Sequence, residues 1–288
     1  MAVFESVYKG IQGKGARVVF PEAQVTEIAE AIGILESKNL AVSVPLSATC
    51  DAHVDAIQKV RPKTRENIAK RLLDKPLFKA AAMVAVGEAD AMVAGIANPT
   101  KAVIEAALMT IGSPEGAVPA SFFLMALPDG RAFVFADCAV NVAPDAQALA
   151  RIGASASAAA QRLLGSGQVG FLSYSTGTSG VGPSVDLVAE ATSLAAAAGV
   201  PCVGPVQADA ALNAAIGQKK GLSGDAPVAL VFPSLDAGNI GYKLVQELAG
   251  AQAVGPILTG FRRPVADLSR GASADDIVKA AAVALALG

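Results

Sequence analysis

Short apolar runs alternate with longer segments of helical periodicity along most of this chain. The runs have the length and the side chains of buried strands, and we expect strands at residues 17–20, 41–44, 91–94, 121–127, 132–135, 169–173, 228–232 and 254–258. Helices are expected between them at residues 26–37, 64–73, 76–86, 100–111, 146–164, 184–198, 207–216, 239–248 and 273–287. This alternation predicts an α/β protein with mainly parallel sheets.

One connection breaks the alternation. Pro128-Asp-Gly130 is a hairpin signal between the strands at 121–127 and 132–135. The chain has 288 residues, which is enough for one large domain or two modest ones. Because no polar linker or fixed-period repeat separates the halves, we expect the chain to cross from one domain to the other near this hairpin.

Composition excludes several classes of protein. The chain is 53% hydrophobic and 17% charged, so a large core is expected. A net charge of −2 gives no electrostatic reason to expect nucleic acid or an anionic membrane as a partner. The first residues do not have the pattern of a signal peptide, and Gly and Pro interrupt the long uncharged stretch at 191–208, so no membrane span is expected. Three widely spaced cysteines favour a reduced, cytoplasmic setting.

His53 is the only histidine, and it lies in a polar segment where a surface position is expected. A Ser-His-Asp triad would have to use it, and no nucleophile elbow is present. We find no pair of His and Cys residues at a spacing that favours zinc, so no metal site is expected.

A run of hydroxyl residues and glycines, residues 173–184, lies between an expected strand and an expected helix. Its glycines let the backbone turn, and its amides can face an anion at a helix N-terminus. Ser184 is the expected N-cap of that helix. The candidate binding residues of this loop are Ser175, Thr176, Gly177, Ser179 and Gly180. The alternative is an ordinary strand-to-helix turn.

A second cluster contains Ser269, Arg270 and Asp276. Arg270 is a permanent planar cation that suits a phosphate or an oxyanion. Asp276 is the nearest acid–base candidate, but Ser273 three residues earlier also fits a capping box with Asp in place of Glu. Capping and catalysis are both open for Asp276, and the two roles are compatible.

Two further segments offer binding residues. Cys138 follows a hairpin strand without a neighbouring cation or histidine, so a partly buried thiol that lines a pocket is favoured over a nucleophile. Asn239 and Tyr242 lie near an expected helix start. Asn239 is a candidate substrate ligand or the cap of that helix.

These segments together resemble the phosphate acetyltransferase and phosphate butyryltransferase family. The matching sequence segments are frequent from about residue 132 onward and fewer in residues 17–125. They comprise residues 135–141 (FADCAVN), 172–180 (LSYSTGTSG), 204–211 (GPVQADAA), 232–246 (FPSLDAGNIGYKLVQ), 255–258 (GPIL) and 267–271 (DLSRG).

The resemblance implies two α/β domains arranged as in isocitrate and isopropylmalate dehydrogenases, with the active-site cleft between them. We expect a first domain of residues 1–122 plus 261–288, because the final helix of the family returns to it, and a second domain of residues 123–260. The family is homodimeric, and two apolar helical runs, 146–164 and 187–200, suggest contact through the second domain.

The resemblance also implies reversible transfer of an acyl group, with acetyl expected, between an acyl phosphate and coenzyme A, which releases inorganic phosphate. Coenzyme A is then a substrate, and no permanently bound cofactor or metal is implied. By the family motif, Asp276 takes the thiol proton, Arg270 binds the phosphate and polarises the carbonyl, and Ser269 stabilises the transition state or the leaving phosphate.

Two positions depart from the family. Glu27 and Glu105 stand where many members of the family carry arginines, which the resemblance assigns to binding anionic substrate groups. A carboxylate in place of a cation reverses the local field for an anion. The alternative function is therefore a non-catalytic protein that binds acyl-CoA or acyl phosphate and acts as a sensor or assembly partner.

Overall fold

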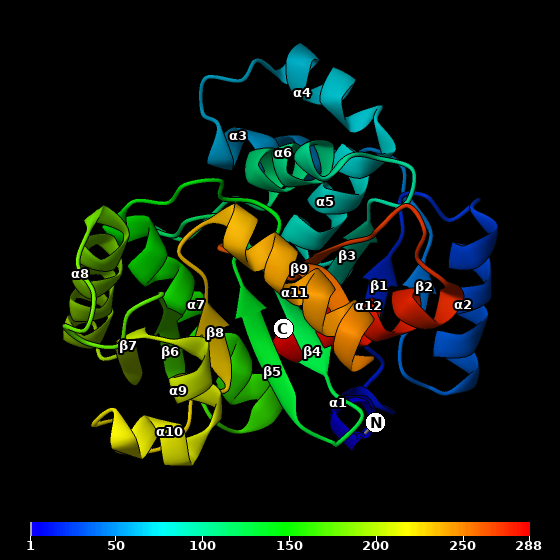
Figure 1. Cartoon of the computed structure of the whole chain (residues 1–288). Helices are drawn as coiled ribbons and strands as arrows, with labels where there is room; N and C mark the ends of the chain where they lie inside the picture. Colours follow the sequence, from blue (N-terminus) through cyan, green and yellow to red (C-terminus); the bar gives the residue numbers. More distant parts are fainter. Residues whose placement is uncertain (1) are drawn as a thin grey trace. The chain divides into compact units, whose positions relative to one another are not determined.

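The computed structural model describes residues 2–288, which form two compact units (Figure 1). The first unit comprises Ala2–Pro119 with Val254–Gly288, and the second comprises Ala120–Ala253. Each is an α/β layer structure with its own strands and covering helices, as the alternating sequence predicts.

In the first unit the strand order is β2-β1-β3-β10-β9. The pairings of β2, β1, β3 and β10 are parallel, and β9 runs antiparallel to β10. The strands are β1 (Arg17–Val19), β2 (Val42–Val44), β3 (Ala91–Ala94), β9 (Gln252–Thr259) and β10 (Val265–Asp267). All four residues of β3 are buried, as expected for a central strand covered on both faces.

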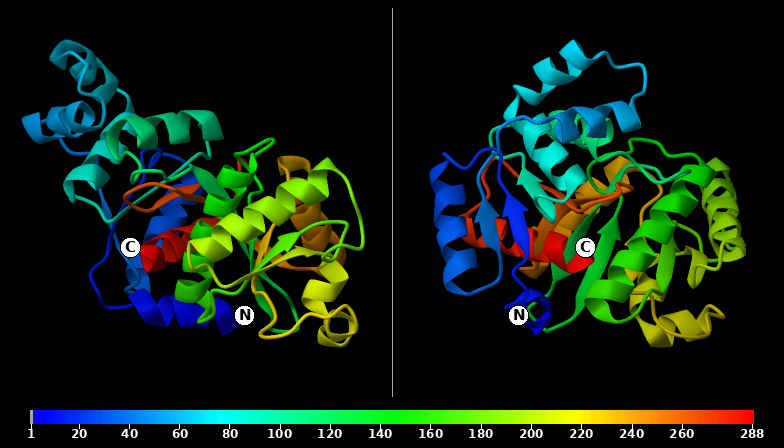
Figure 2. Two further views of the ribbon diagram at one scale, coloured as in Figure 1. Left: turned by 90° about the vertical axis from the view of Figure 1, so that its left-hand side faces the viewer. Right: turned by 180° about the vertical axis from the view of Figure 1, so that it is seen from behind.

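Helix α12 packs on β3 and β10, with α1 and α2 beside it, and α5 packs on β1 and β3 with α3, α4 and α6 around it (Figures 1 and 2). The helices of this unit are α1 (Ala2–Ile11), α2 (Thr26–Ser37), α3 (Asp51–Val60), α4 (Glu66–Leu73), α5 (Pro76–Val86), α6 (Thr100–Thr110) and α12 (Ala274–Leu287). Both α5 and α12 are rich in alanine, whose small side chain allows close packing. Seven residues of α5 and nine residues of α12 are buried.

In the second unit the strand order is β4-β5-β8-β6-β7. The β4–β5 pair is the predicted antiparallel hairpin, and the pairings of β5, β8, β6 and β7 are parallel. The strands are β4 (Ala120–Ala126), β5 (Ala132–Ala136), β6 (Val169–Leu172), β7 (Cys202–Val206) and β8 (Ala229–Val231). All residues of β4 and β6 are buried, so both strands read as continuous apolar runs.

Helices α7 (Ala146–Leu164) and α8 (Pro183–Ala197) cover one face of this sheet (Figure 1). A hydrophobic core cluster on the other face joins β4 and β5 to α9 (Ala208–Leu212), α10 (Ala214–Lys219) and α11 (Leu235–Ala249). The expected helix at 207–216 is therefore two short helices. Asn213 ends the first and caps the second, since its side chain accepts hydrogen bonds from the amides of Ala215 and Ile216.

Candidate functional site

Ser269 and Arg270 lie directly beyond β10, on the turn that leads to α12. Both residues are exposed. Among the described residues, no carboxylate lies within ion-pair distance of the Arg270 guanidinium. The Ser269 hydroxyl accepts a long hydrogen bond of 3.4 Å from the Gly271 amide. An arginine and a hydroxyl thus stand at the carboxyl end of a strand, with hydrogen-bonding capacity left for an anion.

Asp276 is part of the first turn of α12 and forms the expected capping box. Its Oδ2 accepts hydrogen bonds from the Ser273 amide at 3.0 Å and from the Ser273 hydroxyl at 2.7 Å. The Asp276 amide donates to Ser273 Oγ at 3.2 Å. The capping interpretation is confirmed. The carboxylate is nevertheless exposed, so the cap fixes its position without removing it from solvent.

Asp267, the last residue of β10, is a buried carboxyl group next to the Ser269–Arg270 turn. Burial raises its pKa to about 6, and the nearby Glu22 acts in the same direction, although a hydrogen bond from Thr100 opposes them. Thr100 Oγ1 donates to Oδ2 at 2.5 Å, whereas Oδ1 is buried and has no side-chain hydrogen-bond partner within residues 2–288. Asp267 is not among the residues predicted from the sequence, because only burial distinguishes it from an exposed aspartate.

Glu22 organises the turn that follows β3. Its carboxylate accepts hydrogen bonds from the amides of Gly95, Ile96 and Ala97 and from the Asn98 side chain, at 2.6 to 3.2 Å. A cavity of about 370 Å³ lies beside this turn, and its lining includes Glu22, Lys75, Asn98 and Glu105. Glu105 therefore faces a cavity at the same end of the parallel strands as Ser269.

In the second unit, the serine hydroxyl groups of the loop between β6 and α8 mostly form hydrogen bonds within the loop. Ser175 is buried, and its hydroxyl accepts a hydrogen bond from the Gly180 amide at 2.8 Å and contacts Ser179 Oγ at 3.1 Å. The hydroxyl of Ser179 in turn accepts from the Thr176 amide at 3.0 Å. The expectation that Ser184 caps α8 is wrong, because the helix begins at Pro183 with Gly182 at the N-cap.

Two residues of this loop, Thr176 and Gly177, form hydrogen bonds to the segment around the end of β7. Thr176 Oγ1 accepts from the Gln207 amide at 3.1 Å, and the Gly177 amide donates to the Pro205 carbonyl at 2.9 Å. The loop is thereby attached to the residues at the end of β7. Gly177 and Ser179 remain exposed, and Gly180 is half-buried, so the outer rim of the loop is open to a ligand.

Cys138 is fully buried, which corrects the expectation of a partly buried thiol. It belongs to the hydrophobic core cluster of the second unit, and burial raises the pKa of its thiol well above the ordinary value. Its neighbour Asp137 is also buried and accepts hydrogen bonds from Ser121 and from the backbone and side chain of Asn141. Asp137, rather than Cys138, determines the shape of this turn.

Asn239 does not cap α11. The helix begins four residues earlier, at Leu235, and Ser234 is its cap through a hydrogen bond from the Ala237 amide. Asn239 instead donates from Nδ2 to the Cys138 carbonyl at 3.0 Å, so it joins the helix to the Asp137 turn. Tyr242 stacks on Phe123 with ring centroids 4.0 Å apart. Both residues are half-buried, with part of each side chain accessible.

His53 is buried, so the expected surface position is wrong. Cys50, His53 and Glu88 form a cluster of metal-ligand type, whose Cys-x-x-His spacing the sequence argument missed. However, Nδ1 of His53 lies 3.5 Å from Cys50 Sγ while Nε2 lies 3.1 Å from Glu88 Oε1. One ion cannot use both ring nitrogens, so this arrangement serves hydrogen bonding between α3 and the end of α5.

Comparison with known proteins decides the family. A sequence model described as "Phosphate acetyl/butaryl transferase" matches residues 47–285. The chain belongs to this family.

Relatives and structures agree with the family model. The phosphate acetyltransferase of Bacillus subtilis strain 168 is 35% identical over 99% of the chain and 98% of its own length. That of Nitratidesulfovibrio vulgaris is 41% identical over 83% of the chain, which spans only 35% of that relative. The crystal structure of a phosphotransacetylase from Streptococcus pyogenes superimposes with a TM-score of 0.90, at 30% identity over 99% of this chain and 97% of that one. The family's α/β fold is thereby confirmed.

A membrane-spanning role finds no support in the helices: none within residues 2–288 combines the length and the apolar content that crossing a bilayer requires.

Proposed function

We propose that this protein is a phosphate acyltransferase, which transfers an acyl group reversibly between an acyl phosphate and coenzyme A. Acetyl is the proposed acyl group. The observation that carries the proposal is the exposed Arg270, which has no carboxylate at ion-pair distance among residues 2–288. It follows Ser269 in sequence and precedes the capped carboxylate of Asp276, in a chain that the family model matches from residue 47 to residue 285.

The proposed reaction needs a base, a cation and a hydrogen-bond donor. Asp276 removes the proton of the coenzyme A thiol, and the sulfur forms a bond to the carbonyl carbon of the acyl phosphate. Arg270 stabilises the oxyanion that develops there and binds the phosphate. Ser269 donates a hydrogen bond to the phosphate as the carbon–oxygen bond breaks. The proton on Asp276 then passes to the departing phosphate or to solvent, which regenerates the carboxylate. The products are the acyl-CoA thioester and inorganic phosphate.

The remaining binding groups are proposed from the second unit: the loop residues Ser175 to Gly180, with Asn239, Tyr242 and Cys138. The exposed loop rim supports contact with a substrate, whereas the burial of Ser175 and Cys138 makes them supports of neighbouring backbone. Coenzyme A, acyl phosphate and inorganic phosphate are the proposed small-molecule partners, without a resident cofactor or metal.

We further propose that the two compact units correspond to the two domains, 1–122 plus 261–288 and 123–260, with the substrates in a cleft between them. The proposed setting is cytoplasmic, and the proposed assembly is a homodimer through the second domain. The two compact units, each with mainly parallel strands, support this division.

A steady-state assay tests the activity. Purified protein is supplied with coenzyme A and acetyl, propanoyl or butyryl phosphate, and formation of the thioester is followed. Arg270→Gln should lower kcat/KM by roughly 10- to 100-fold, because a charge-assisted hydrogen bond is worth about 1.5–3 kcal/mol. Arg71→Gln, which changes an exposed arginine on α4, is the matched control and should behave as wild type.

Absence of thioester from the wild-type protein with all three acyl phosphates would exclude the proposed transfer. If the protein then still bound acyl-CoA or acyl phosphate, the non-catalytic alternative would replace it.

A further inference from the structure

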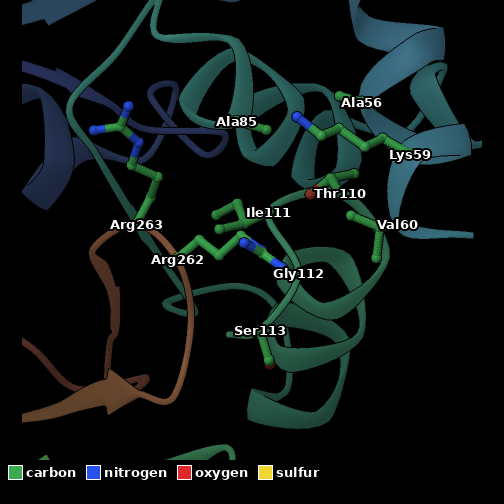
Figure 3. A pocket seen from close by; sticks show the side chains of 10 residues that line it. All are labelled: Ala56, Lys59, Val60, Ala85, Thr110, Ile111, Gly112, Ser113, Arg262 and Arg263. Atoms are coloured by element: carbon green, nitrogen blue, oxygen red, sulfur yellow. The ribbon is translucent and has the colours of Figure 1, made fainter. Parts of the chain in front are cut away.

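A second cavity of the first unit lies at the opposite end of the parallel strands from Ser269. It has a volume of about 390 Å³ and is lined by residues from α3, the end of α5, the segment after α6 and the turn before β10: Ala56, Lys59, Val60, Ala85, Thr110, Ile111, Gly112, Ser113, Arg262 and Arg263 (Figure 3). Arg262 and Arg263 precede β10, whereas Ser269 and Arg270 follow it. The cavity is therefore separate from the proposed catalytic residues.

The lining carries three cations and no carboxylate. In Figure 3, Lys59 and Arg262 reach toward the middle of the cavity from opposite sides, while Arg263 extends away from them. Within residues 2–288, neither Lys59 nor Arg262 has a carboxylate at ion-pair distance. One hydroxyl of the lining, Ser113 Oγ, is buried and has no hydrogen-bond partner in the described part of the chain.

Three helices end at this cavity: α3 at Val60, α5 at Val86 and α6 at Thr110. Each helix C-terminus carries a partial charge of about −0.5. Arg263 is directed away and interacts electrostatically with Asp90. The three helix ends oppose Lys59 and Arg262 but do not cancel them, because each side chain carries a whole charge. The excess is positive, and the Arg262 amide, which donates to the Gly112 carbonyl at 3.0 Å, holds the turn in place.

We propose that this cavity binds a small metabolite through a phosphate monoester group. A dianionic phosphate would lie between Lys59 and Arg262, and the planar guanidinium offers it two parallel donors. Ser113 supplies a further donor. The volume is at the lower end of the range for ligand pockets, which fits a small metabolite. This inference does not depend on the proposed acyl transfer.

The competing explanation is that Lys59 and Arg262 only stabilise the helix ends that they face. The two explanations differ in what the side chains bind. In the competing case Lys59→Gln or Arg262→Gln lowers the melting temperature, and phosphate esters do not bind to the wild type at this cavity.

The experiment is calorimetric titration of glycerol 3-phosphate into the full-length protein and its variants at low ionic strength. Lys59→Gln and Arg262→Gln should each weaken binding about tenfold or more, since each removes a charge-assisted contact. Arg71→Gln is the control for a general loss of positive charge and should bind as wild type. Arg270→Gln weakens the proposed catalytic phosphate site at the other end of β10, so the binding that remains in this variant should be the binding that Lys59→Gln and Arg262→Gln weaken.

Several outcomes would overturn the proposal: no binding of glycerol 3-phosphate to the wild type at millimolar concentration, loss of binding in Arg270→Gln but not in Arg262→Gln, or equal weakening in Arg71→Gln. Inorganic phosphate is titrated in parallel into Arg270→Gln, in which the proposed catalytic phosphate site is weakened. If it binds this cavity more tightly than the ester does, the cavity is a site for free phosphate, and the ester is not its ligand. Melting temperatures measured on the same samples identify any variant that fails to fold.

Discussion

Asp276 is placed by a cap and yet remains open to solvent. Its carboxylate accepts two hydrogen bonds from Ser273, which fixes its position at the start of α12. A base that must meet a thiol benefits from such a fixed geometry, because less freedom is lost when the substrates bind. Capping and catalysis are therefore compatible at this residue.

Replacing Asp276 by Asn should separate the two roles. Asn retains a side-chain oxygen for the Ser273 donors but cannot take a proton, so turnover should fall by about 100-fold or more while stability changes by less than about 1 kcal/mol. Turnover and melting temperature are measured on the same sample. Asp275→Asn, at the adjacent first-turn aspartate that pairs with Lys279, is the control for loss of a charge. A lower melting temperature with unchanged turnover per folded molecule would assign Asp276 to capping alone.

Asp267 should make the stability of the protein depend on pH. Its pKa is raised from 3.8 to about 6, so between these values the folded state holds a proton that the unfolded state has lost. The free energy of unfolding should therefore fall as the pH rises from about 4 to about 6, by roughly 3 kcal/mol from this group alone.

The test compares Asp267→Asn with wild type by denaturant unfolding at several pH values. Asn cannot ionise, so the variant should gain stability relative to wild type as the pH rises through this window and stay level above it. A difference between the two proteins that does not change with pH would contradict the burial of an ionisable group at Asp267.

Helix α11 is positioned by a glycine, Gly238, whose lack of a side chain allows close contact with neighbouring backbone. Gly238 packs on the Asp137 turn so closely that an added Cβ would lie 2.2 Å from the Asp137 carbonyl oxygen. The helix also donates from Asn239 to the Cys138 carbonyl. The segment Gly238-Asn239 therefore anchors α11, and the start that the sequence suggested at Asn239 is an anchor point within the helix.

Gly238→Ala should destabilise the protein by at least about 2 kcal/mol, because backbone must move to admit the methyl group. Gly33→Ala in α2 is the matched control. No atom lies within 4 Å of its added Cβ, so it should stabilise by about 0.5–1 kcal/mol through helix propensity. Denaturant unfolding of both variants measures the difference. Equal effects of the two substitutions would show that Gly238 is not in close contact.

The predicted elements were most accurate where the sequence has a clear period or a clear stop. The helix expected at 146–164 and the strand expected at 91–94 have those bounds in the structure. Gly165 ends the helix in a left-handed conformation, φ 77°, which a glycine adopts easily. By contrast α3 and β10 were not predicted, because polar residues interrupt the apolar pattern of α3 and β10 has only two apolar residues, Val265 and Ala266.

An exposed apolar surface on α11 allows the proposed dimer to be tested. Ile240, Leu244 and Leu248 of α11 are 57%, 53% and 83% exposed and recur every four residues, so they form one stripe along the helix. The helices that the sequence favoured for a dimer, α7 and α8, pack on each other and on the sheet. An exposed stripe of this kind favours α11 as the contact within the second unit.

Leu244→Glu should shift the protein from dimer to monomer, because a carboxylate in an apolar contact loses its hydration. Leu194→Glu on α8, where the leucine is 38% exposed, is the control and should remain dimeric. Light scattering at micromolar concentration measures the mass. A monomeric wild type would exclude the dimer, and dissociation by Leu194→Glu alone would assign the contact to α8.

The sequence by itself determined the α/β class, the hairpin of the second unit and the segment that carries Ser269, Arg270 and Asp276. These follow from local periodicity, turn residues and short sequence motifs, each of which extends over only a few positions. Only the tertiary structure decided that His53 and Cys138 are buried, that Asp267 holds a raised pKa, and that Lys59 and Arg262 share one cavity. Packing decides which side chains are buried and which residues distant along the chain come into contact. A local sequence pattern does not contain this information.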